Sequence, residues 1–114
     1  MTDRLSISGF SALSHPVRLA LFRTLCQRAP DTVSAGELAS GFDIPPSTMT
    51  GHLQALERAG LIRSQRRSRF MLYSLDHDGT RQFLTFLLKD CCGDQPDLLA
   101  GLVENNATVL QEAS

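Results

Sequence analysis

Apolar residues in the first half of the chain recur every three or four positions, which is the spacing of α-helices with one buried face. Pro16 and Pro46 suit the first turn of a helix, and Gly60 suits the position just after a helix end. The pattern predicts four helices, at residues 5–13, 16–29, 34–40 and 46–59. The last two are separated by a tight turn, so together they predict a helix-turn-helix.

Ser34 and Glu37 have the spacing of a capping box at the start of the third predicted helix. In a capping box, the serine hydroxyl and the glutamate carboxylate each accept a hydrogen bond from the other residue's backbone N–H. We therefore expect both hydrogen bonds at this helix end.

The pattern becomes extended after the fourth predicted helix. Residues 61–65 and 70–75 favour two strands joined by residues 66–69. This hairpin is the wing of a winged helix-turn-helix, so the predicted fold class is mainly α with a small β-hairpin (α+β). Asp78 is placed to cap a fifth helix that runs to about Cys91. That helix has apolar residues on more than one face and needs packing partners.

The net charge of −1 hides an uneven distribution. Residues 1–75 hold nine basic and five acidic residues, for +4, whereas residues 76–114 hold two basic and seven acidic residues, for −5. Four of the arginines fall within seven positions at the predicted hairpin: Arg63, Arg66, Arg67 and Arg69. A basic wing predicts contacts with DNA phosphates or the minor groove, which we assign to Arg66, Arg67 and Arg69. The alternative is a solvated hairpin tip.

The fourth predicted helix has an apolar face, formed by Met49, Leu53 and Leu56, that we expect to face the core. Its other side presents small and polar residues: Ser47, Thr48, Thr50, Gly51 and Gln54. Serine and threonine hydroxyls bind phosphates or base edges, and glutamine pairs with adenine. These residues therefore predict DNA recognition in the major groove, and a merely solvated helix face is the alternative.

One further residue of this helix, His52, completes the candidate DNA-binding set. We expect His52 to pack or to contact a phosphate rather than to bind a metal. Gly51 costs a helix about 1 kcal/mol relative to alanine. Its presence predicts either a close approach to this face or a relaxed sequence preference.

Three cysteines provide the remaining chemistry. Cys26 lies on the apolar face of the second predicted helix, where we expect a small buried side chain. Cys91 and Cys92 are adjacent at a helix end, before Gly93. Neighbours on a regular helix diverge by about 100°, but fraying at the glycine would let both thiolates bind one soft ion. Zinc is disfavoured, because the following segment adds only aspartates, which are poor partners for such a site.

The length of 114 residues suits one compact domain, which we place at residues 1–95 for DNA binding and dimerisation. Residues 96–114 form a tail that we expect to be partly helical or disordered. The chain lacks an apolar run of the ~20 residues that span a bilayer, and its N-terminus does not resemble a signal peptide. We therefore expect a cytoplasmic protein without a membrane partner.

Three segments resemble the ArsR/SmtB family of winged-helix repressors: residues 10–18, 46–53 and 56–62. The resemblance spans residues 5–92. It implies a homodimer formed by the first and fifth helices and a fourth helix that enters the major groove of operator DNA. It also implies that an inducer bound to the dimer releases the DNA.

The Asp-Cys-Cys-Gly sequence at residues 90–93 is similar to a subgroup of this family that senses trivalent arsenic or antimony. Members of that subgroup usually add a third cysteine shortly afterward, where this chain has Leu98 or Leu99. The resemblance thus implies Cys91 and Cys92 as the ligands of the metalloid. A two-thiolate site suits a singly methylated or aryl trivalent arsenical better than arsenite. No obligatory cofactor is expected.

Two alternatives remain open. One is a redox or persulfide sensor, in which Cys91 and Cys92, or one of them with Cys26, are reversibly oxidised or persulfidated instead of binding a metalloid. A winged helix can also be a protein-interaction module that does not bind DNA. An enzyme is not expected, because the sequence offers no combination of nucleophile, base and orienting group.

Overall fold

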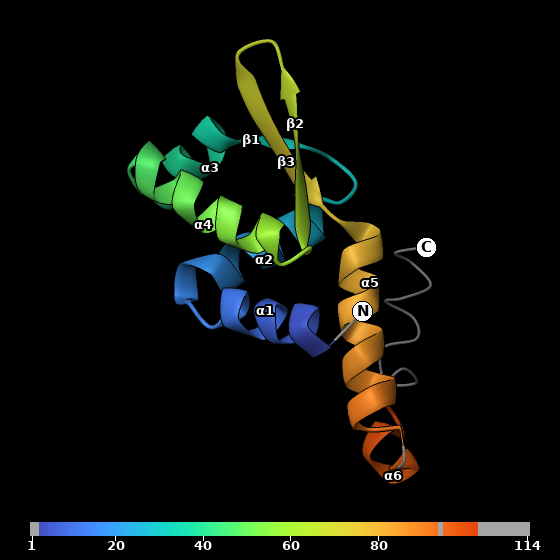
Figure 1. The fold of residues 1–114 in the computed structure, drawn as a ribbon. Coiled ribbons are helices and arrows are strands. Elements are labelled where there is room, and N and C mark those ends of the chain that lie inside the picture. Colours follow the sequence, from blue (N-terminus) through green and yellow to red (C-terminus); the bar gives the residue numbers. More distant parts are fainter. Residues whose placement is uncertain (1–2, 94, 103–114) are drawn as a thin grey trace. The chain divides into compact units, whose positions relative to one another are not determined.

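The computed structural model describes residues 3–93 and 95–102. Its elements, shown in Figure 1, are α1 (Asp3–Leu13), α2 (Pro16–Arg28), β1 (Val33–Ser34), α3 (Ala35–Phe42), α4 (Pro46–Arg58), β2 (Ile62–Arg67), β3 (Phe70–Leu75), α5 (His77–Thr85), the π-helix η1 (Phe86–Cys91) and α6 (Pro96–Leu99). The chain divides into two compact units, residues 1–83 and 84–114, and each is described by itself. The division between a domain at residues 1–95 and a tail at 96–114 stays a prediction.

The first unit has the predicted fold class, with four helices followed by a hairpin. Its three strands form an antiparallel sheet in the order β1-β3-β2. In Figure 1 the β2–β3 hairpin extends away from helices α1 to α4. Arg67 pairs with Phe70, so Ser68 and Arg69 make the turn, with Ser68 in the left-handed region at a φ of 59°.

Strand β1 was not predicted from the sequence. It is two residues long, and its Val33 pairs with Tyr73 of β3. A strand of this length is too short to produce a hydrophobic alternation, because the alternation has a period of two residues. Its stability comes from pairing with β3, about 40 residues further along the chain.

The core of the first unit lies between α2, α4 and the start of β2. Met49, Leu53 and Leu56 of α4 are completely buried, which confirms the predicted inner face of this helix. Leu21 and Leu25 of α2 are equally buried. Burial of each such side chain contributes roughly 1.5–3 kcal/mol relative to full exposure. The orientation of α4 is therefore determined by its own packing.

The start of α3 has half of the predicted capping box. Ser34 Oγ accepts a hydrogen bond from the N–H of Glu37 at 3.1 Å, as expected. The Glu37 carboxylate does not complete the box, because it pairs with the guanidinium of Arg28 at 2.8 Å instead. A charged partner on α2 thus replaces the expected backbone donor.

Helix α5 begins at His77, two residues earlier than a cap at Asp78 would allow. Asp76, not Asp78, is the capping residue, and its Oδ1 accepts a hydrogen bond from the N–H of Gly79 at 2.9 Å. The hydroxyl of Thr80 donates to the carbonyl of Leu61 at 3.1 Å and links the first turn of α5 to the residue just before β2. The prediction was wrong because both aspartates have suitable spacing, and the tertiary contact selects between them.

Phe83, the last residue of the first unit, packs against α1. Its ring meets that of Phe10 edge to face, with the centroids 4.9 Å apart. A Cβ atom at Gly9 would lie 2.5 Å from a ring carbon of Phe83. The glycine that weakens α1 as a helix is therefore what allows the aromatic ring to approach it.

The second unit departs from the expected regular helix. α5 gives way after Thr85 to η1, in which every residue is exposed or half-buried. Leu84, Leu88 and Leu98 are exposed by 49%, 38% and 61%. The four-residue α6 lies at the start of the tail predicted at residues 96–114, most of which lies outside the described residues. No helix among those described is long and apolar enough to span a membrane.

Candidate nucleic-acid interface and thiol pair

Helix α4 presents the predicted candidate residues on the side opposite its buried face. Ser47, Thr48, Gly51 and Gln54 are exposed, while Thr50 is half-buried. The Thr50 hydroxyl donates to the carbonyl of Pro46 at 3.0 Å and keeps its capacity to accept a hydrogen bond. The α4 surface is thus a polar face of short side chains without a net charge.

The start of α4 adds a second kind of donor. Among the residues that the structure describes, no side chain caps this helix, whose first position is Pro46. Backbone N–H groups of the first turn therefore lack helical partners, and the helix dipole makes this end favourable for a phosphate. Asp43, with a φ of 54°, makes the left-handed turn that separates α3 from α4.

Gly51 lies in the middle of α4 with open space around it. A Cβ atom built at this position would meet no described atom within 4 Å. The absence of a side chain here is therefore not explained by packing within the described part of the chain. Both explanations offered by the sequence therefore remain: a close approach to this face from outside the protein, or a relaxed sequence preference.

His52 forms a contact that the sequence did not predict. Its Nδ1 accepts a hydrogen bond from Nε of Arg18 at 3.2 Å, and its ring centroid lies 4.6 Å from that of His15. His15 in turn accepts a hydrogen bond from the N–H of Val17 and caps α2. Burial, then the nearby charges of His15 and Arg18, lowers the pKa of His52. Since Arg18 can only donate, a neutral His52 carries its proton on Nε2.

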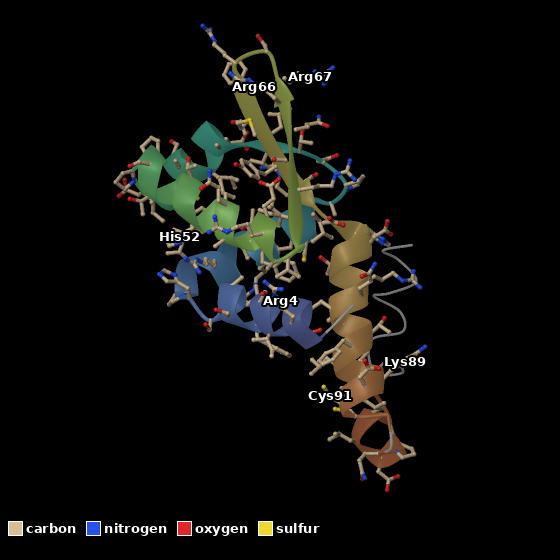
Figure 2. The ribbon with its side chains drawn as sticks, viewed as in Figure 1. Arg4, His52, Arg66, Arg67, Lys89 and Cys91 are labelled. Carbon is tan, nitrogen blue, oxygen red and sulfur yellow. The ribbon has the colours of Figure 1, made fainter. Side chains whose placement is uncertain are left out.

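The wing presents its arginines to solvent. Arg66, Arg67 and Arg69 are exposed, and Figure 2 shows Arg66 and Arg67 at the outer end of the hairpin. The single ion pair within residues 3–93 and 95–102 is that of Arg28 with Glu37, so the wing arginines have no carboxylate partner there. Arg69 lies 5.6 Å from the ring centre of Phe70, which is itself 54% exposed. Exposed Phe70 was not among the predicted site residues.

The one carboxylate of α4 is directed away from this surface. Glu57 accepts a hydrogen bond from the Ser64 hydroxyl at 2.6 Å, on the side of the helix that faces β2. Burial raises the pKa of the neighbouring Tyr73, and the charge of Glu57 adds to that shift. The outer face of α4 and the wing therefore present donors and positive charge.

The two adjacent thiols lie where η1 ends. Cys91 is exposed and Cys92 is half-buried. The N–H groups of Cys92 and Gly93 both donate to the carbonyl of Lys89, and a Cβ atom at residue 93 would collide with that carbonyl. The described residues bring no group of three or more histidine, cysteine or acidic side chains together.

Cys26 does not lie where the sequence predicted. It is exposed on α2, whereas the preceding residue, Leu25, is completely buried. The broad apolar pattern of α2 covers more residues than the core can accept, and Leu21 and Leu25 occupy the inward positions. Partial burial raises the pKa of the Cys26 thiol.

Comparison with known proteins extends this description. A helix-turn-helix domain model matches residues 13–65. The chain is 35% identical over 81 residues to the HTH-type transcriptional regulator YgaV of Escherichia coli, covering 71% of this chain and 80% of that protein. It is 31% identical over 86 residues to the biofilm growth-associated repressor of Agrobacterium fabrum, covering 75% of this chain and 71% of that protein.

Solved structures with the same fold include an ArsR family transcriptional regulator, with a TM-score of 0.67 at 21% identity over 89% of this chain and 96% of the other. They also include a homodimeric winged helix-turn-helix domain from Mycobacterium bovis, with a TM-score of 0.61 at 22% identity over 83% and 90%. The fold is thus that of winged helix-turn-helix DNA-binding proteins. The chain belongs to the helix-turn-helix transcriptional regulators.

Proposed function

We propose that this regulator is a dimeric repressor of the ArsR type, which trivalent arsenicals or antimonials release from operator DNA by binding Cys91 and Cys92. The observation that carries the proposal is the juxtaposition, in one unit, of an uncapped polar helix face and a wing with three unpaired arginines. ArsR-family membership is supported by the sequence resemblance and by the shared fold.

In the proposed complex, α4 lies in the major groove. Ser47 and Thr48 bind backbone phosphates near the start of the helix, while Thr50 and Gln54 contact base edges. Gly51 leaves room for the duplex, and neutral His52 donates from Nε2 to a phosphate. Arg66, Arg67 and Arg69 neutralise phosphates along the adjacent minor groove.

Dimerisation is supported by apolar surface on two helices. Ile7 and Phe10 of α1 are exposed by 66% and 44%, and Leu84 and Leu88 follow on the α5–η1 segment. Large apolar side chains exposed to solvent are a feature of interaction sites. A second copy of the chain is the proposed partner, and the dimer would present two α4 helices to one operator.

The inducer half of the proposal rests on the two thiols. A trivalent arsenical with one carbon substituent exchanges its two oxygen ligands for two sulfurs. Each thiol gives up its proton, and two waters leave. Arsenite would require a third thiolate for the same saturation, and the described residues supply none near the pair. Binding acts on DNA affinity only through its preference for the DNA-free state.

A DNA-release assay tests the inducer proposal. Operator-bound protein is titrated with methylarsonous acid, arsenite and antimonite in a small monothiol reductant, because dithiols would chelate the metalloid. Methylarsonous acid is expected to release DNA at a lower concentration than arsenite does. Cys91→Ser and Cys92→Ser are expected to bind DNA normally and to lose release, with Cys26→Ser as the matched control that keeps both.

Two results would replace this proposal. Release by peroxide or persulfide without release by arsenicals would make the pair a redox sensor. Loss of release in Cys26→Ser alone would move the sensing thiol to α2.

A further inference from the structure

A groove of about 430 Å³ runs between α1 and α4 in the first unit. Buried alanines of the two helices, Ala12 and Ala59, belong to its lining, and their short side chains leave the hollow between the helices. Arg18 reaches it from α2. Its lining shares Ile7 with the proposed dimer surface but includes none of the residues assigned to DNA contact and neither of the two adjacent thiols.

The lining has the chemistry of a receptor for negatively charged oxygen. Two guanidiniums, Arg18 and Arg58, and two serines, Ser8 and Ser11, line the groove, and none of its described lining residues is acidic. Neither arginine has a carboxylate partner within the described residues, where Arg28 forms the one ion pair. Arginine offers paired donors that match a phosphate or a carboxylate.

The nearest acidic residue on α4 does not neutralise this charge. Glu57 precedes Arg58 but is held on the β2 side of the helix by the Ser64 hydroxyl, at 2.6 Å. Arg18 is half-buried, so its charge is less screened than that of an exposed side chain. A concave site with two unpaired arginines therefore remains positively charged.

We propose that the groove binds an oxyanion, a phosphate or carboxylate group, held by Arg18 and Arg58 with Ser8 and Ser11 as additional donors. Either the operator backbone or a small free anion would supply this group. The identity of the source rests on the proposed function, because only a DNA-binding protein could place an operator phosphate in the groove. The binding of an anion as such does not depend on the proposed function.

Arg18 links this site to the recognition helix. Its Nε donates to Nδ1 of His52 at 3.2 Å, which leaves its two terminal amino groups for the anion. Arg58 lies on α4 itself, two turns after His52. An anion in the groove therefore contacts α4 directly at Arg58 and indirectly at His52, through Arg18. Because of these contacts, occupancy of the groove and DNA affinity are thermodynamically linked.

The first arm of the test uses full-length protein without DNA. Inorganic phosphate and, separately, citrate are titrated at constant ionic strength while the arginine Nε–H resonances are followed by NMR. Saturable shifts at Arg18 and Arg58 are expected. Arg58→Gln, at an exposed position, should weaken binding about tenfold or more, the loss expected for one charge-assisted hydrogen bond. Arg23→Gln, on the exposed side of α2 and outside the groove lining, is the charge-matched control.

Thermal unfolding establishes that the variants are folded. Arg18→Gln removes the other guanidinium of the groove and should also weaken binding of the anion. The absence of saturable binding, or equal weakening by Arg23→Gln and Arg58→Gln, would overturn the proposal. This arm is unaffected if the chain fails to bind an operator.

The second arm distinguishes the two sources. If the operator backbone fills the groove, Arg58→Gln should reduce the slope of log K against log salt by about 0.9 for each lost contact. If a small anion fills it, the slope should stay that of the unsubstituted protein, and added phosphate or citrate should change DNA affinity at constant ionic strength. Both results support an oxyanion site, provided that the first arm shows binding.

Discussion

Helix α4 and the α5–η1 segment carry the two halves of the proposed function but are held in different ways. α4 has three completely buried side chains, Met49, Leu53 and Leu56, on one face. In α5–η1 the buried residues, Thr80 and Phe83, lie before the division between the two units, and the residues after it are exposed or half-buried. The helix proposed to read DNA is therefore positioned by packing within its own unit, whereas the segment with the thiols has no buried side chain among its described residues after Phe83.

That difference suits a sensor. A recognition surface has to be preorganised, because each residue that must be ordered on binding costs affinity. A segment whose geometry is set by a partner or a ligand can respond to either one, because weakly packed regions are the ones that change conformation at low free-energy cost. The π-turn before Cys91 and Cys92 is such a segment.

The largest expected effect comes from substitutions that disrupt the proposed contacts of the α5–η1 segment. Leu84→Asp or Leu88→Asp would place an unpaired charge in the proposed dimer interface, which costs several kcal/mol. We expect a monomer by analytical ultracentrifugation and a loss of operator affinity. Gln82→Asp, which adds the same charge at an exposed position of α5, is the control. A dimer that survives both leucine substitutions would show that this face is not the interface.

The anchor of α5 on α1 gives the next effect. Gly9→Ala would bring a methyl group to within 2.5 Å of Phe83, so it should destabilise the fold by about 1–3 kcal/mol, as overpacking does. Differential scanning calorimetry should record a fall in Tm of roughly 4–8 °C per kcal/mol. Gly41→Ala, which meets no described atom within 4 Å, is the matched control. An unchanged Tm in Gly9→Ala would mean that α5 is not held there.

The smallest effect concerns the well-packed recognition helix. Gly51→Ala should stabilise the free protein by up to about 1 kcal/mol through helix propensity. It should also weaken DNA binding, because the added methyl group occupies space that the proposed complex fills with the duplex. Gly41→Ala should leave DNA binding unchanged. Equal or tighter binding by Gly51→Ala would favour the alternative of a relaxed sequence preference.

The sequence predicted most of the well-packed unit because its signals are local. Proline at helix starts, a three-and-four periodicity and a glycine helix stop are all visible within a few residues of the feature they determine. The strongest example is α4, where the inner residues Met49, Leu53 and Leu56 were all identified. Local signals are sufficient where local structure and tertiary packing agree.

The predictions that failed depended on contacts between distant residues. Strand β1 exists because Val33 pairs with Tyr73, and the Glu37 carboxylate leaves its capping box because Arg28 is available. The bond from Arg18 to His52 joins residues 34 positions apart. No pattern within either helix predicts that hydrogen bond. The presence of a histidine among outward-facing residues was nevertheless a reason to look for a residue that binds it.

The salt dependence of operator binding tests the central claim most directly. Protein with Arg66, Arg67 and Arg69 all replaced by alanine is compared with the unsubstituted protein in fluorescence anisotropy titrations across a range of salt concentrations. If the exposed wing neutralises phosphates, the slope of log K against log salt should flatten by about 0.9 for each lost contact, with weaker binding to every sequence. An unchanged slope in a folded triple variant would contradict the account, because the wing would then not lie on DNA.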